Sequence, residues 1–161
     1  MKTNKIKFIT QAALISAIYI ALTLIANALG LANAAIQVRF SEALTILPVF
    51  TSAAVPGLFV GCLLSNILTG CAPWDILFGS LATLIGAIFT LKLKNLKWVA
   101  SLPPIISNTI IVPFVLSYVY GAEGTIPYLM VTVAIGEIIS CAVLGNLLRI
   151  ALKPHEKIFK L

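Results

Sequence analysis

The feature that most constrains this chain is the alternation of long apolar runs with three short basic clusters. Charged residues make up 10% of the chain, whereas a soluble domain usually carries about 25%. A soluble protein needs a polar outer shell, which these apolar runs cannot supply. The sequence therefore predicts an all-α integral membrane protein with a single domain over residues 1–161. The basic clusters lie at the start, in the middle and near the end: Lys2, Lys5 and Lys7; Lys92, Lys94 and Lys97; Arg149, Lys153, Lys157 and Lys160.

The spacing of the apolar runs predicts six transmembrane helices, over residues 8–30, 41–54, 56–70, 75–91, 102–120 and 126–152. Cytoplasmic segments of membrane proteins are enriched in Lys and Arg. Six crossings that start inside place all three basic clusters on the cytoplasmic side, whereas five crossings would separate them. We therefore expect both termini to be cytoplasmic.

The lengths of the runs carry two further expectations. The first run is longer than the apolar core of a cleavable export signal, which is about 7–15 residues, so we expect a retained helix. The second and third runs are short, because a full span needs about 20 residues. Either both segments are short, tilted spans, or the segment 41–54 crosses only part of the bilayer.

Small residues recur one helical turn apart in the first run, at Ala13, Ala17 and Ala21. Residues four apart share one face of a helix, and small side chains let two helices approach closely in lipid. This face serves either internal packing or the docking of a separate protein. Gly57, Gly61 and Ser65 repeat the spacing, and there we expect internal packing.

Polar side chains inside the apolar runs are the strongest functional signal, because ionisable groups cost about 2.5–3.5 kcal/mol at the centre of a bilayer helix. The predicted topology places most of them in the outer half of the membrane and two, Asn108 and Glu137, nearer the middle. Together they predict a substrate pocket open to the outside, suited to a flat, nitrogen-rich heterocycle. The candidate residues are Arg39, Glu42, Asn66, Trp74, Asp75, Asn108, Tyr128, Glu137 and Ser140.

Seven of the nine candidates also have a structural interpretation. Asp75 is a possible helix N-cap, and Arg39 with Glu42 a possible ion pair. Trp74 and Tyr128 suit the membrane interface, and the two asparagines suit hydrogen bonds between helices.

The remaining motifs exclude several activities. Cys62, Cys71 and Cys141 lack the spacing of a metal site, so we expect packing residues, no metal and no cofactor. The chain has no phosphate-binding loop for ATP and no catalytic constellation. We therefore expect a non-enzymatic protein that binds a ligand or uses the energy of a partner.

Several segments resemble the QueT family: residues 38–48 (VRFSEALTILP), 56–66 (PGLFVGCLLSN), 75–83 (DILFGSLAT), 102–108 (LPPIISN) and Gly136-Glu137. The similarity covers nearly the whole chain. The family comprises substrate-binding S components of energy-coupling factor (ECF) transporters in the bacterial plasma membrane, which take up queuosine precursors.

The resemblance implies a six-helix bundle with an outward-facing pocket, a transmembrane coupling subunit and two cytoplasmic ATPases as partners. It also implies that Ala13, Ala17 and Ala21 contact the coupling subunit. The implied substrate is a 7-deazaguanine such as queuine or its aminomethyl or cyano precursor. The choice of pocket residues rests on the predicted topology alone.

The chemistry of such a ligand agrees with the candidate residues. A carboxylate, Glu137 or Glu42, can accept two hydrogen bonds from the base edge, and a second acidic residue suits the amine. Three alternatives stay open: an S component for riboflavin or thiamine, a small proton-coupled exporter that uses a membrane glutamate, and a structural membrane subunit without a ligand.

Overall fold

The computed structural model describes residues 2–31, 37–96 and 98–159. Asn33, which lies in the first predicted outer loop, Lys97 and Lys160 fall outside these ranges. Over the described ranges the regular structure is helical throughout, which confirms the all-α prediction.

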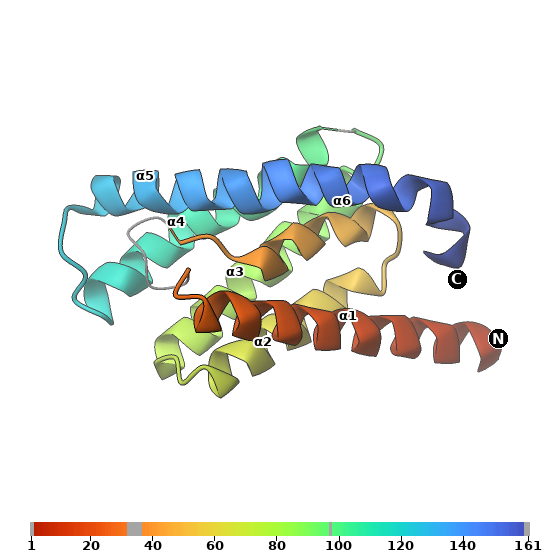
Figure 1. Ribbon diagram of the computed structural model, residues 1–161, viewed down its shortest axis with the longest axis horizontal. Coiled ribbons are helices and arrows are strands. Elements are labelled where there is room, and N and C mark those ends of the chain that lie inside the picture. Colours follow the sequence, from red (N-terminus) through yellow and green to blue (C-terminus); the bar gives the residue numbers. More distant parts are fainter. Residues whose placement is uncertain (1, 32–36, 97, 160–161) are drawn as a thin grey trace.

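The bundle is built from long helices joined by short connections (Figure 1). The N-terminal half holds α1 (Lys2–Ala28), η1 (Phe40–Val49), α2 (Ala54–Leu68) and α3 (Pro73–Lys92). The short η2 (Val99–Ser101) leads into α4 (Leu102–Tyr118). The last helical stretch runs without interruption through α5 (Ile126–Glu137), η3 (Ile138–Leu144), α6 (Gly145–Leu152) and η4 (Lys153–Phe159).

Four helical stretches among the described residues are long and apolar enough to cross a membrane: Asn4–Ala28, Pro73–Lys92, Val99–Tyr118 and Ile126–Phe159. The other two, η1 and α2, are apolar but shorter. The α2 helix has 15 residues, which gives a length of about 22 Å against a hydrocarbon core of about 30 Å. The expected shortness of these two segments is therefore confirmed.

The second predicted helix, 41–54, differs in type and length from the observed one. The segment is a 3₁₀ helix of 10 residues that ends at Val49. Pro48 has no N–H to donate to a helical ladder, and the Thr45 hydroxyl donates back to the carbonyl oxygen of Glu42 at 2.6 Å. Because a 3₁₀ helix rises about 2.0 Å per residue, these ten residues extend about 20 Å rather than the 15 Å of an α-helix.

Glycines bring the first helices into close contact. A side chain at Gly57 would meet the backbone of Ala12 at 2.7 Å, and one at Gly61 would meet Cβ of Tyr19 at 2.8 Å. The α1 and α2 helices therefore pack backbone to backbone, which agrees with the packing role expected for this glycine ladder. The packed core around this contact contains Ile15, Tyr19, Leu44, Leu47, Ala54, Leu58, Cys62 and Ala87.

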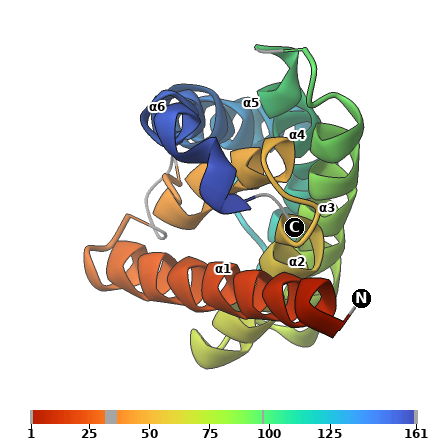
Figure 2. The ribbon, with the colours of Figure 1, turned by 90° about the vertical axis from the view of Figure 1, so that its right-hand side faces the viewer.

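Both ends of the chain lie at the same end of the bundle (Figures 1 and 2). Gln11 on α1 donates a hydrogen bond to the carbonyl oxygen of Ile158 at 3.2 Å. A groove at this end is lined by Lys94, Arg149 and Lys153, so the middle and C-terminal basic clusters meet there. The opposite end carries the connections that follow α2 and α4.

Candidate functional site

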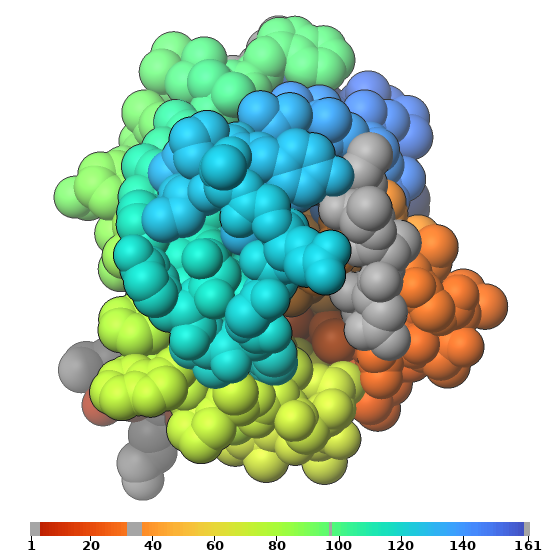
Figure 3. Space-filling model, turned by 90° about the vertical axis from the view of Figure 1, so that its left-hand side faces the viewer, coloured from red at the N-terminus to blue at the C-terminus, as the bar shows by residue number. Residues whose placement is uncertain are grey.

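A polar cavity of about 400 Å³ lies at the end of the bundle opposite the termini. Figure 3 looks onto this end and shows the surface hollowed between the yellow-green end of α2 and the teal end of α4. Its volume falls within the range of about 300–1,000 Å³ that is typical of ligand sites. The lining residues come from five segments: Thr23, Ala26, Asn27, Gln37, Arg39, Asn66, Thr69, Gly70, Cys71, Asp75, Val112, Leu116 and Tyr120.

Three of the predicted residues, Arg39, Asn66 and Asp75, lie together on the wall of this cavity. The Arg39 guanidinium donates to Oε1 of Gln37 at 3.4 Å. Burial alone would lower the pKa of Arg39, but electrostatic interactions with Tyr19, Asp75 and Glu42 outweigh burial and raise it. Arg39 is therefore a permanent cation, and the carboxylate and amide beside it add an acceptor and a donor.

Asp75 is not the cap of its helix. The α3 helix begins at Pro73 after Ala72, and Asp75 lies in its first turn. Its Oδ2 accepts a hydrogen bond from the Tyr120 hydroxyl at 2.8 Å, and that hydroxyl accepts one from the Ala72 amide at 3.0 Å. Burial and the Asp75 carboxylate raise the pKa of Tyr120, so its hydroxyl remains a donor. The cluster joins the start of α3 to the segment after α4 at the rim of the cavity.

A second polar layer lies one helical turn beneath the cavity wall. Thr23, Asn66 and Val112 line the cavity, and the residues four positions earlier on the same helix faces are Tyr19, Cys62 and Asn108. These three are buried, with exposed fractions of 1%, 1% and 4%. We call Tyr19, Cys62 and Asn108, together with Glu42, Glu137 and Cys141, the polar floor.

Glu42 and Glu137 form the centre of the polar floor. The Tyr19 hydroxyl donates to Oε1 of Glu42, and the Cys141 thiol donates to Oε2 of Glu137 at 3.2 Å. Glu42 is therefore bonded to Tyr19 and not to Arg39, the partner in the alternative ion-pair interpretation, and its Oε2 is buried without a hydrogen-bond partner. One oxygen of each carboxyl group and the thiol sulfur lie within 4.8 Å of one another.

Two ionised carboxylates at this separation repel each other. At 4.8 Å the repulsion is about 3 kcal/mol with an effective dielectric constant near 20. The pair is therefore most stable when one positive charge lies between its oxygens. A proton or another cation can supply that charge.

A local widening of the last helix positions Glu137. The seven residues of η3 form a π-helix that begins directly after Glu137 and contains Ser140 and Cys141. Such segments occur frequently at functional sites because they redirect side chains. Ser140 accepts a hydrogen bond from the backbone amide of Arg39 at 3.2 Å, which joins this helix to the start of η1.

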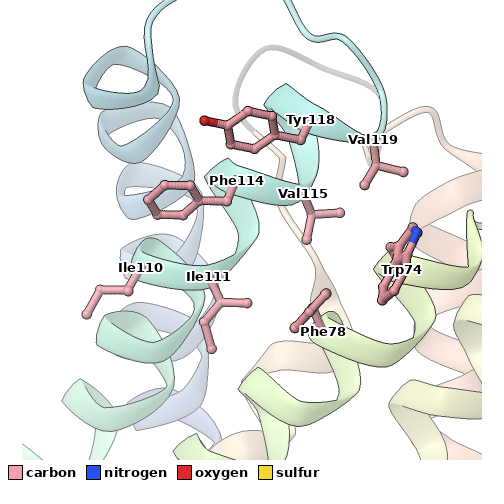
Figure 4. A pocket seen from close by; sticks show the side chains of 8 residues that line it. All are labelled: Trp74, Phe78, Ile110, Ile111, Phe114, Val115, Tyr118 and Val119. Carbon is pink, nitrogen blue, oxygen red and sulfur yellow. The ribbon is translucent and has the colours of Figure 1, made fainter.

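Two predicted residues, Trp74 and Tyr128, line other hollows. Trp74 is 59% exposed and lines an apolar groove of about 510 Å³ between α3 and α4, where its ring stacks on Phe78 (Figure 4). Tyr128 is 55% exposed and lines a smaller cavity of about 220 Å³ with Glu123. This smaller cavity shares Gln37 and Leu116 with the polar cavity, so Tyr128 lies beside the main site.

Several residues of the site were missed at the level of sequence, above all Tyr19, Cys62, Cys141 and Tyr120. Tyr19 does have a recognisable signal, because Ser16, Tyr19 and Thr23 recur at helical spacing on a face distinct from that of the alanine ladder. The two buried cysteines lie in the polar floor and take part in its hydrogen bonds, beyond the packing expected of them.

Comparisons with known proteins connect this geometry to a family. A curated relative is the "Queuosine precursor transporter QueT" of Lactococcus lactis subsp. cremoris (strain MG1363), which is 31% identical over 86 residues. The match covers 53% of this chain and 50% of the relative, so half of the relative's length has no counterpart in the alignment. No solved structure matches the chain. The QueT transporter family model matches residues 9–154, and the chain belongs to this family of membrane transporters.

Proposed function

We propose that the chain is the substrate-binding S component of an ECF importer for a queuosine precursor in the bacterial plasma membrane. The observation that carries the proposal is the polar cavity of about 400 Å³ above a buried glutamate pair, inside an apolar helical bundle. The name of the Lactococcus relative supports the choice of substrate.

The shape of a 7-deazaguanine suits this cavity. Its N1–H and exocyclic amine form one edge of the ring system, and a carboxylate such as Asp75 can accept both hydrogen bonds. Arg39 can donate to the neighbouring carbonyl oxygen, and Asn66 lies on the same wall. The opposite end of the ring system then points to the polar floor.

The orientation in the membrane follows from the two ends of the bundle. The N-terminal part of α1, the C-terminal segment and the middle basic cluster share one end, which the enrichment of cytoplasmic segments in Lys and Arg assigns to the inside. The cavity lies at the other end and opens outward. Six crossings, with η1 and α2 as short, partly spanning segments, bring both termini to the cytoplasm.

Partners supply the energy for transport. Ala13, Ala17 and Ala21 are exposed on α1, and the first two line an apolar groove of about 490 Å³ between α1 and α2. We assign this face to the transmembrane coupling subunit, which connects the chain to two cytoplasmic ATPases. The chain itself binds and releases the substrate without chemistry.

Two measurements on the same protein test this function. Isothermal titration of the purified chain with queuine and its aminomethyl and cyano precursors should show binding, while riboflavin and thiamine should not bind. In cells, Ala17→Leu should abolish uptake of the precursor and leave binding unchanged, whereas Ala151→Leu, at an exposed alanine of α6, should leave both intact. Binding of riboflavin or thiamine instead of the 7-deazaguanines would refute the substrate.

The buried glutamate pair also fits a proton-coupled transporter. The two functions differ in their energy source. Uptake that stops when the proton gradient collapses, and that continues with the ATPases inactivated, would favour the proton-coupled transporter.

A further inference from the structure

The surroundings of the cavity carry an excess of negative charge. Asp75 lies on its wall, and Glu42 and Glu137 lie in the polar floor, while Arg39 is the one cation among the described lining residues. A site of this kind favours a positively charged ligand over a neutral one of the same shape.

The groups that face the glutamate pair come from every element packed around it. None of the described neighbours apart from Arg39 brings a positive charge, and Arg39 lies at the level of the cavity wall. The facing titratable or polar groups are Tyr19 on α1, Cys62 on α2, Asn108 on α4 and Cys141 on η3, with Asp75 on α3 acting on Arg39.

An independent feature of the pair points to a missing donor. Glu42 is 1% exposed, and its Oε2 is buried without a hydrogen-bond partner, in a carboxyl group that lies within 4.8 Å of Glu137 and Cys141. A buried carboxylate oxygen without a partner is rare in folded proteins and destabilising. The other oxygen of Glu42 accepts the hydrogen bond from Tyr19, so Oε2 is the oxygen that can accept a bond from a new donor.

We propose that Glu42 and Glu137 form a cation-exchange subsite, which holds one proton in the free protein and exchanges it for the ammonium group of the bound ligand. This inference rests on the proposed function. The charge balances, because the ligand arrives as R–NH₃⁺, the shared carboxyl proton leaves to water, and the pair then accepts hydrogen bonds from the ammonium group.

The geometry of the ligand agrees with such an exchange. The aminomethyl substituent of a 7-deazaguanine and its N1–H edge lie at opposite ends of the ring system. With the N1–H edge on Asp75 at the wall, the substituent points one helical turn deeper, about 5.4 Å, to the level of the pair. The subsite therefore distinguishes precursors with an amine, including queuine, from the cyano precursor.

Titration calorimetry in two buffers of different ionisation enthalpy, at the same pH, tests the exchange. The aminomethyl compound should release roughly one proton per bound ligand, and the cyano compound should release none. Lowering the pH should weaken binding of the aminomethyl compound, because protons compete for the pair, and should leave the cyano compound unaffected.

Conservative variants locate the effect. Glu137→Gln and Glu42→Gln should each weaken binding of the aminomethyl compound about 10- to 100-fold and abolish proton release, with little change for the cyano compound. Glu123→Gln, in the adjoining cavity, is the matched control and should preserve the preference and the proton release. Unchanged binding of the cyano compound shows that each variant is folded.

Two outcomes would overturn the inference, and they differ. If the wild-type chain binds both precursors equally and without proton release, the exchange is wrong and the proposed function stands. If it binds no 7-deazaguanine at all, the proposed function is wrong, and the proposed exchange is wrong as well.

Discussion

Two hollows lie on either side of the α3–α4 pair, and they differ in chemistry more than in size. The apolar groove of about 510 Å³ is lined by Trp74, Phe78 and Phe114, whereas the polar cavity of about 400 Å³ is lined by Arg39 and Asp75. Trp74 and Asp75 are neighbours in the sequence and point into different hollows. The larger hollow is therefore not automatically the binding site.

The surrounding lipid explains why the two hollows differ in chemistry. Apolar side chains on the outside of a membrane protein face lipid chains that are as apolar as they are, so an exposed groove there needs no ligand. Polar and charged groups at the same depth are costly and usually serve a function. We therefore assign the binding site to the polar cavity, and the following predictions test that assignment in order of decreasing effect on ligand affinity.

The largest effect is expected for the wall of the polar cavity. Arg39→Ala and Asp75→Ala each remove a charged hydrogen-bonding group and should weaken binding of the aminomethyl precursor about 10- to 100-fold. Titration calorimetry measures the loss. Asp75→Asn should retain part of the affinity, because the amide oxygen still accepts one hydrogen bond. Affinity unaffected by both alanine substitutions would place the ligand elsewhere.

Gly136 should produce the next largest effect. A side chain at Gly136 would collide with the carbonyl oxygen of Gln37, a residue of the cavity lining, whereas one at Gly145 would meet its nearest neighbour at an ordinary 3.4 Å. Gly136→Ala should cost about 1–3 kcal/mol of stability and weaken binding about tenfold. Gly145→Ala on the same helical stretch is the control and should change neither. Thermal unfolding in detergent and calorimetry provide the two readouts.

Tyr19→Phe should have a smaller effect. The change removes the hydroxyl that donates to Glu42 and leaves the second oxygen of this carboxylate without its partner. The affinity for the aminomethyl precursor should therefore fall about three- to tenfold. Tyr118→Phe, at a tyrosine that is 77% exposed in the apolar groove, should have no effect on affinity. Equal effects of the two substitutions would contradict a role for the polar floor in binding.

The comparison of the two hollows also shows how much of the fold and of the site can be predicted from the sequence. The composition predicted the all-α class. The positions of the basic clusters predicted the topology, and this topology predicted that Arg39, Asn66 and Asp75 lie close together. Burial of Glu137 followed from its position in an apolar run. These predictions depend on the free-energy cost of placing a charged side chain in lipid. That cost can be judged for each residue from its position in the sequence, without knowledge of its neighbours in the fold.

Other features depend on which face of a helix points inward, and the sequence leaves this open. The topology predicts one pocket for Trp74 and Asp75 because it places both at the outer rim of the membrane, but consecutive helical residues point in directions about 100° apart. Tyr19 and Cys141 look like ordinary packing residues until η1 is placed beside them. The 3₁₀ geometry of η1 and the π-helix after Glu137 are set by tertiary contacts, which local sequence patterns do not encode.

The smallest effect is expected for the apolar groove itself. Phe114→Ala should change ligand affinity less than about twofold, because the side chain is 42% exposed and lines the groove that we assign to lipid. Trp74 offers a direct probe, since Trp74 and Trp98 are the two tryptophans of the chain. In a Trp98→Phe background, Trp74 fluorescence should be quenched by lipids brominated near the headgroup and should not respond to the aminomethyl precursor. Protection of Trp74 by the precursor, without quenching by these lipids, would show that the ligand occupies the apolar groove and would reverse the assignment of the two hollows.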